Sequence, residues 1–406
     1  MSGFDPRGVA AYHRLYSDES AKQAQLMGWD IRVGPRKRIS TLSSEWKVER
    51  RDGESVTTTT FEFLHWDDIV RRHWHEGFLR LYRLACKTYW RGIVTTGILF
   101  RLARTAKWPF ITGIAPAFAF FIVPLLALAA GYATYYALID RIPASPWIAM
   151  VSGAAAFLAL CGLALWLTRE LNLNWLLRSY AFTTEYGLGK VPELDGRIIQ
   201  FTDRVAGYLE TSTDDEVLIV GHSSGANMAV SLLARLLRAN PAAGSRVPAW
   251  ALLTLGGSIP MQGLLDQEED FRSELAFLNK FESLPWVDIS AAEDVASFAA
   301  LNPVHASGIA YGVTDARRPR VLSGEFRKIL TEKTYGRASW DLFRMHFQYL
   351  MAQEVPCEND YFSITTDTAT FAHRFGFDAV EEGGEGASQG SPVERGDGVA
   401  AVQTHR

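Results

Sequence analysis

Residues 216–225 read Glu-Val-Leu-Ile-Val-Gly-His-Ser-Ser-Gly, and residues 226–237 that follow carry apolar side chains at helical spacing. The apolar run 216–220 is typical of a central parallel strand that is buried on both faces. Gly221 and Gly225 stand two residues before and after Ser223, where a sharp turn needs strand and helix to approach closely. The stretch therefore predicts a strand, a tight turn and a helix, with the Ser223 hydroxyl at the top of a parallel sheet.

This order resembles the nucleophile elbow of the α/β-hydrolase superfamily, and Gly-His-Ser-Ser-Gly is similar to its lipase- and esterase-like members. The resemblance covers residues 1–85 and 180–375 loosely. It implies an α/β fold with a doubly wound, mostly parallel sheet, a Ser–Asp/Glu–His triad in that chain order, no cofactor, and the Ser224 N–H as one oxyanion donor. His222 is interpreted as a packing residue. The alternative is a strand-to-helix turn of another α/β protein, with Ser223 as a helix cap.

The acid is expected beyond the next strands, which we place at 249–258 and 284–290. Asp294 follows the second of them, at a spacing from Trp286 that resembles the strand-end acid of lipases, and is our first choice. Asp288 lies inside the strand and is the second. Either aspartate is alternatively a helix cap or a surface acid. The amphipathic stretch 261–283 between the strands is a possible cap over the site.

The base should follow the acid in the chain. His346 begins a His-x-x-Tyr sequence that resembles the C-terminal histidine of lipases, and His373 is the alternative. His305 comes too soon after the acid, and His405 lies near the end of the chain. A core histidine on an apolar helix remains the other interpretation of His346.

A second oxyanion donor comes, in hydrolases of this kind, from a loop after an early strand. Residues 3–8 suit such a loop, with Gly3 giving conformational freedom and the Phe4 N–H as the donor. The strand that should precede the loop is missing from the sequence. An ordinary N-terminal turn is the alternative.

Two long segments, Trp108–Ile139 and Ile142–Thr168, contain no charged residue and no histidine. Because about 20 apolar residues span a bilayer, we predict transmembrane helices near 109–138 and 146–167; a buried helical hairpin is the alternative. Basic residues on both flanks place the large flanking regions in the cytoplasm by the positive-inside rule. With the resemblance to a bacterial membrane-anchored branch, this implies an inner-membrane protein with a cytoplasmic hydrolase domain.

The predicted organisation follows from these segments. Residues 1–90 and 176–375 form the hydrolase domain, 91–175 are a membrane insertion, and 376–406 are a disordered tail rich in glycine and acidic residues. The net charge of −4 argues against a nucleic-acid partner. Three widely spaced cysteines indicate neither a disulfide framework nor a zinc site, and the histidines show no metal-binding spacing.

The sequence thus predicts a membrane-anchored serine hydrolase that cleaves an ester or related acyl bond through an acyl-enzyme. Its expected partners are the lipid bilayer and a small-molecule or lipid acyl substrate. Two alternatives stay open: an inactive scaffold with a hydrolase fold, and an acyltransferase that uses the same serine.

Overall fold

The protein, described by a computed structural model, has a mixed α/β architecture; residues 1–141, 145–243, 247, 249–265, 270–309 and 318–377 are described. Its central element is a four-stranded parallel sheet in the order β5-β6-β7-β8. The strands are β5 (Glu216–His222), β6 (Ala249–Leu255), β7 (Trp286–Ser290) and β8 (Arg320–Ser323). The segments expected to be strands at 216–220, 249–258 and 284–290 therefore lie side by side in one sheet.

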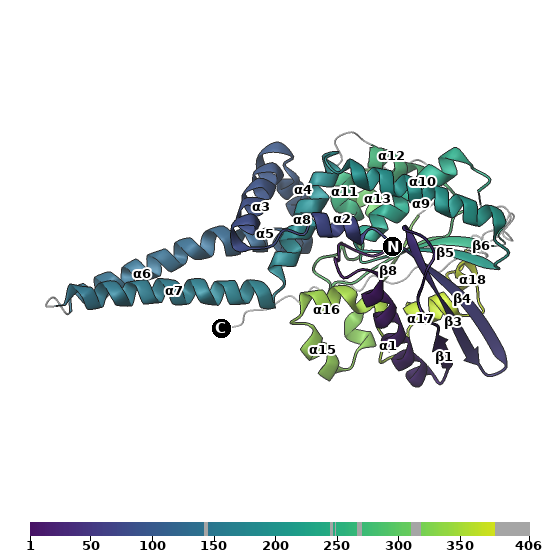
Figure 1. Ribbon diagram of the computed structural model, residues 1–406, viewed down its shortest axis with the longest axis horizontal. Helices are drawn as coiled ribbons and strands as arrows, with labels where there is room; N and C mark the ends of the chain where they lie inside the picture. The colour runs from purple at the N-terminus through teal and green to yellow at the C-terminus, as the bar shows by residue number, and fades with distance from the viewer. Residues whose placement is uncertain (142–144, 244–246, 248, 266–269, 310–317, 378–406) are drawn as a thin grey trace, which may run out of the picture.

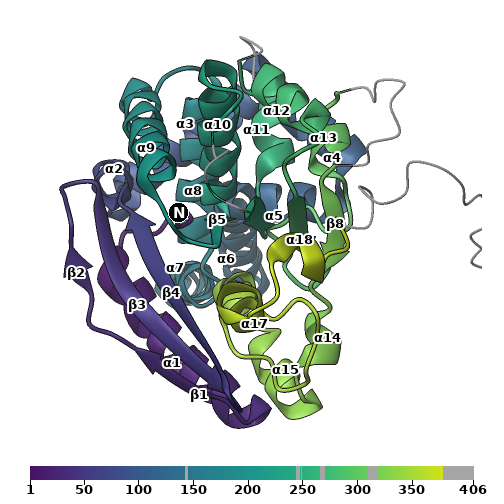
Figure 2. The same cartoon turned by 90° about the vertical axis from the view of Figure 1, so that its right-hand side faces the viewer.

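Both faces of this sheet are buried, as the apolar runs require. Leu252 of β6 packs into a core with α9 (Pro192–Thr211), α10 (Ser224–Ala239) and α12 (Asp270–Lys280). Its neighbours Leu253 and Leu255 pack into a second core on the other face, with α1 (Val9–Met27) and the C-terminal helices. Figure 2 shows the two layers on opposite sides of the strands.

The N-terminal strands form a separate antiparallel sheet: β1 (Asp30–Val33), β2 (Lys37–Arg38), β3 (Ser43–Asp52) and β4 (Ser55–Leu64). In a doubly wound sheet, strands would be added on both sides of the first one. Among the described strands, those of the parallel sheet follow β5 on one side only, so this part of the expectation is not seen. On the other side lies Met1, whose N–H donates to the Val220 carbonyl at 2.8 Å and whose carbonyl accepts from the His222 N–H at 3.1 Å. This is the bonding pattern of a parallel neighbour, so Met1 lies beside β5 as a residue of an adjacent parallel strand would.

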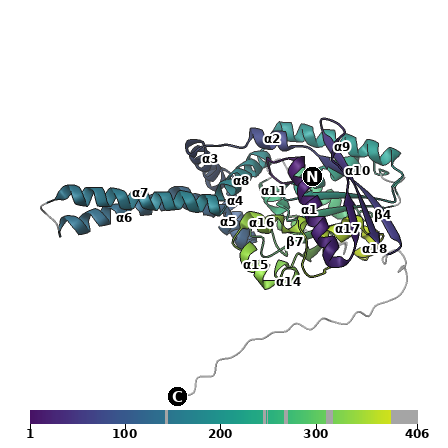
Figure 3. The same cartoon turned by 60° about the horizontal axis from the view of Figure 1, so that its bottom comes forward.

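A helical layer links the body to two long helices, α6 (Val123–Ile139) and α7 (Pro146–Glu170). The layer comprises α3 (Phe78–Trp90), η1 (Arg91–Thr95), α4 (Ile98–Thr105), α5 (Lys107–Ala117), η2 (Phe118–Ile122) and α8 (Leu173–Gly187). The continuous segment Lys107–Ile139 and the helix Pro146–Glu170 are each long and apolar enough to cross a membrane, and only 28% and 11% of their most apolar windows are buried. Figures 1 and 3 show α6 and α7 projecting together from the body. Core helices of a soluble protein would instead be mostly buried.

The two projecting helices touch at their backbones. A Cβ added to Gly131 of α6 would lie 2.8 Å from the Gly153 carbonyl oxygen, and one added to Gly153 of α7 would lie 2.7 Å from that of Gly131. Small residues at such crossings are typical of packed helices in membranes. The pair therefore forms a close-packed hairpin.

The remaining helices cover the sheet and its carboxyl edge. They are α2 (Asp67–Arg72), α11 (Ile259–Leu265), α13 (Pro303–Ala306), α14 (Phe326–Ile329), α15 (Glu332–Ala338), α16 (Leu342–Phe347), η3 (Gln348–Leu350), α17 (Tyr361–Thr366) and α18 (Phe371–Arg374). In the stretch 261–283, α11 and α12 bury apolar side chains in the protein core. Of the predicted tail, residues 378–406 lie outside the described residues.

Candidate active site

Ser223 stands at the turn between β5 and α10 with φ 56° and ψ −125°. Such a positive φ is a strained conformation for a residue with a side chain, and strain of this kind clusters at functional sites. The turn is held by hydrogen bonds from the Ser223 N–H to the Leu255 carbonyl (2.9 Å) and from the Ala226 N–H to the Ser223 carbonyl (3.0 Å). The strand, tight turn and helix that the sequence predicted around Ser223 are therefore all present.

Both glycines of the turn are required by close backbone contacts. A Cβ on Gly221 would lie 2.6 Å from Ala226 Cα, and one on Gly225 would lie 2.5 Å from the Met1 carbonyl oxygen. Neither neighbour is the end of a flexible side chain that could move away. The two glycines of Gly-x-Ser-x-Gly are therefore needed because β5, α10 and the N-terminal residue pack closely around Ser223.

Asp294 and His346 are in direct contact. His346 Nδ1–H donates to Asp294 Oδ2 at 2.8 Å, and the two side chains are only 3% and 1% exposed. The other carboxylate oxygen of Asp294 accepts from the Ala296 N–H at 3.1 Å. Because the carboxylate fixes the proton on Nδ1, Nε2 is left as the acceptor. Nε2 is buried and has no hydrogen-bond partner among the described residues.

Tyr349 completes the surroundings of the carboxylate, from the His-x-x-Tyr sequence. Its hydroxyl donates to Asp294 Oδ2 at 3.1 Å and accepts from the Ala291 N–H at 2.9 Å. Burial, together with the nearby Asp294 charge, raises the pKa of Tyr349 well above its usual value. The phenol therefore stays protonated and remains a donor to Asp294.

His222 connects the nucleophile turn to the histidine segment. Its Nε2–H donates to the His346 carbonyl at 2.9 Å, with ring centroids 5.0 Å apart. Burial is the main reason that the pKa of His222 is lowered to about 3, with the nearby His346 second. A neutral ring that donates through Nε2 positions His346, in agreement with the packing role expected for His222.

The loop 3–8 lies against Ser223. A Cβ on Gly3 would be 2.7 Å from Ser223 Cβ and 3.1 Å from Ser223 Oγ. The loop is braced by the Asp5 N–H, which donates to the Gly3 carbonyl (2.8 Å), and by the ion pair of Asp5 with Arg7 (2.6 Å). The backbone N–H groups of Phe4 and Ser224 have no hydrogen-bond acceptor among the described residues. Both proposed oxyanion donors are thus unpaired beside the serine.

Trp175 is a site residue that sequence reasoning missed. It lies in α8, shortly after the long helix α7, and its Nε1–H donates to the Phe4 carbonyl at 3.1 Å. Its ring centroid is 5.5 Å from that of His346. A tryptophan soon after an apolar segment is a membrane-interface signal, which does not reveal these contacts.

Thr112 also contacts a loop of the site, but it lies before the hairpin in the chain, whereas Trp175 follows it. It lies in α5, and its hydroxyl oxygen is within hydrogen-bond distance of the carbonyl oxygen of Val295 (3.0 Å) and of that of Trp108 in its own helix (2.9 Å). Tyr180 of α8 places its hydroxyl 3.2 Å from the same Thr112 oxygen. Both ends of the hairpin therefore reach the site, one at the loop of Asp294 and one at the loop of Phe4.

The two alternative residues are not brought to Ser223. Asp288 is buried in β7, where its Oδ1 accepts from the Thr254 hydroxyl at 2.5 Å, and burial raises its pKa to about 7. His373 lies on α18, whose Phe371 N–H donates to Glu216 at the start of β5, the end of the strand opposite to Ser223.

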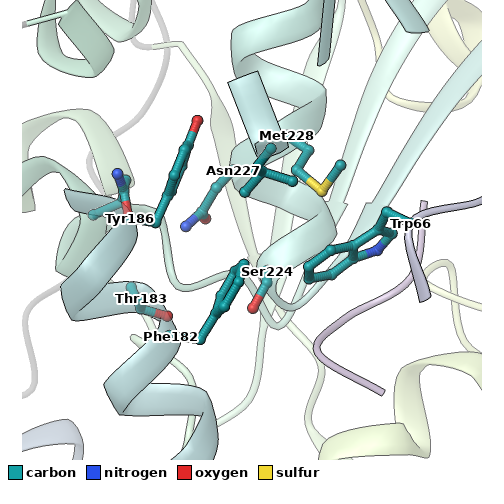
Figure 4. A pocket seen from close by; sticks show the side chains of 9 residues that line it. Trp66, Phe182, Thr183, Tyr186, Ser224, Asn227 and Met228 are labelled. Atoms are coloured by element: carbon teal, nitrogen blue, oxygen red, sulfur yellow. The ribbon is translucent and has the colours of Figure 1, made fainter. Parts of the chain in front are cut away.

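The site is closed. Ser223 is 7% exposed, and a cavity of only about 10 Å³ lies beside the elbow, enough for about one water molecule. Figure 4 shows its wall, formed by α8, the start of α10 and Trp66. The residues that line it are Trp66, Phe182, Thr183, Tyr186, Leu194, Ser224, Asn227, Met228 and Gln262. This space is too small for an acyl substrate.

In the described part of the chain, no group of three or more histidine, cysteine, aspartate or glutamate residues is placed to hold a metal ion. Comparison of the chain with protein-family models, with curated proteins and with solved structures finds no match, so its chemistry is inferred from these residues alone.

Proposed function

We propose that the chain is a serine hydrolase that cleaves a carboxylic ester or related acyl bond. The observation that carries the proposal is the conjunction of a strained Ser223 at the carboxyl end of β5 with the buried Asp294–His346 pair. This is the combination of nucleophile, base and orienting acid that acyl transfer requires. It supports an α/β-hydrolase fold for the parallel sheet and its helices.

In the proposed reaction, Ser223 Oγ attacks the acyl carbon while His346 Nε2 takes the hydroxyl proton. The oxyanion accepts hydrogen bonds from the N–H groups of Phe4 and Ser224; loss of one such donor typically costs about 10²–10³ in rate. His346 then returns the proton to the departing alcohol oxygen, which leaves an ester of Ser223. Water then attacks the acyl carbon while the same nitrogen takes one of its protons, and His346 gives that proton to Ser223 Oγ as the acid leaves. Asp294 stabilises the imidazolium throughout.

We further propose that α6 and α7 span a membrane and that the substrate is lipophilic. Support comes from the length, apolar composition and exposure of the two helices, together with the contacts of Trp175 and Thr112 at the site. A site held at the bilayer surface meets lipids and lipophilic esters at high local concentration.

The test is covalent labelling of the detergent-solubilised full chain by a fluorophosphonate probe. Wild type and Ser224→Ala should be labelled, because Ser224 contributes its backbone and not its hydroxyl, whereas Ser223→Ala should not. Folded wild-type protein that resists labelling would contradict the proposal and favour an inactive scaffold. Labelled protein that passes its acyl group to an added alcohol faster than to water would indicate an acyltransferase.

A further inference from the structure

Helix α3 carries an open groove of about 500 Å³ at the base of the hairpin. Two rows of side chains line it. Within each row the residues are four apart in the sequence, so the members of a row lie above one another along the helix. One row is Tyr82, Cys86 and Trp90, and the other is Arg83, Lys87 and Arg91. The groove thus pairs an exposed, largely aromatic row with a basic one.

The basic row has an excess of positive charge. Glu185 of α8 pairs with Lys87 (3.1 Å) and with Arg91. Among the described residues, no carboxylate lies within ion-pair distance of Arg83, and between Phe78 and Lys107 the sequence has no acidic residue. Three cations at this spacing repel one another, and one carboxylate cannot balance them. An anion is therefore the expected occupant.

The groove lies where the first long helix leaves the body. Tyr82 packs edge-on against Phe121 of η2 (5.6 Å between ring centroids), and Phe78 stacks on Phe120 (6.2 Å). Figure 1 shows α3 beside the root of α6. If α6 and α7 cross a bilayer, this is the headgroup level, where exposed tryptophan such as Trp90 (66% exposed) is favoured.

We propose that this groove binds the headgroup of an anionic phospholipid. The basic row holds the phosphodiester, and the aromatic row lies against the upper acyl chains. Binding needs the membrane placement proposed above but not the chemistry of Ser223, so the two proposals fail separately.

The test is native mass spectrometry of the detergent-solubilised full chain, titrated with phosphatidylglycerol or phosphatidylcholine. Wild type should retain phosphatidylglycerol and release phosphatidylcholine. At about 1 kcal/mol for each basic side chain, Arg83→Gln/Lys87→Gln should weaken retention on the order of 30-fold. The matched control is Lys333→Gln/Arg337→Gln on α15, which removes two exposed charges at the same spacing away from the groove.

Three results would overturn the proposal: equal retention of the two lipids by wild type, equal loss in both double variants, or competition by water-soluble glycerol phosphate at the affinity of the lipid. The last would assign the groove to a soluble phosphate. Thermal unfolding of each variant checks that it is folded. Fluorophosphonate labelling reports on the proposed reaction, which both double variants should retain, since neither pair of residues lies at Ser223.

Discussion

The indole N–H of Trp175 donates a hydrogen bond to the carbonyl oxygen of Phe4, which is 3.1 Å away in space and 171 positions away in the sequence. Phe4 belongs to the loop that lies on Ser223, while Trp175 belongs to the helix that follows the apolar hairpin. The proposed oxyanion loop is therefore held in place from the hairpin side.

Trp175→Phe should lower kcat about tenfold to a hundredfold, because it removes the N–H that holds the Phe4 carbonyl but keeps an aromatic ring beside His346. The unpaired carbonyl should also lower the free energy of unfolding by about 1–3 kcal/mol. Ester hydrolysis and thermal unfolding measure the two effects. Trp166→Phe on α7, where the side chain is 55% exposed, is the control and should change neither.

Gly3→Ala should slow fluorophosphonate labelling by about a hundredfold or more, since the new methyl group would meet Ser223 Cβ at 2.7 Å and displace the nucleophile. Gly196→Ala in α9 is the matched control, because a Cβ there meets nothing within 4 Å. Equal labelling rates for the two variants would show that residues 3–8 are not part of the reactive site.

Asp294→Asn should reduce kcat by about 10⁴-fold, as expected when the carboxylate that orients a catalytic histidine becomes an amide. Asp288→Asn changes a second buried aspartate that contacts Thr254 and should leave kcat within a few fold. Steady-state hydrolysis of one activated ester compares them. The reverse order of effects would exchange the roles of the two aspartates.

Asp288 should make folding stability depend on pH. Burial raises the pKa of Asp288 to about 7, whereas its pKa in an unfolded chain is near 3.9. The folded state therefore binds the extra proton between these values. The free energy of unfolding should fall as pH rises from about 4 to 7, by an amount on the order of 4 kcal/mol, and then level off.

Asp288→Asn should remove that slope. Denaturant unfolding of both proteins in one detergent, from pH 4.5 to 8, measures it. Parallel curves for wild type and variant would mean that Asp288 is ionised at little cost in the folded protein.

The local pattern around Ser223 predicted much of the parallel sheet, because a buried strand, two glycines and a helix are determined by neighbouring residues. Chain order led to Asp294 and His346, which the structure places in contact; their catalytic roles stay predictions. Met1 at the side of β5 could not be foreseen, since two hydrogen bonds from one residue leave no periodic signal. Trp175 and Thr112 escaped notice for a similar reason: their partners are distant in sequence, and each residue fits an apolar helix equally well.

If α6 and α7 span a membrane as proposed, the contacts near the two ends of the hairpin also bear on how a water-soluble form of this protein can be engineered. Excision of residues 91–175 would remove Trp175 and Thr112 together, and with them the side-chain contacts to the Phe4 and Val295 carbonyls. A shortened chain would keep Ser223, Asp294 and His346 but lose the braces on two of their loops. A useful soluble version should instead retain α5 and α8 and shorten only the projecting parts of α6 and α7.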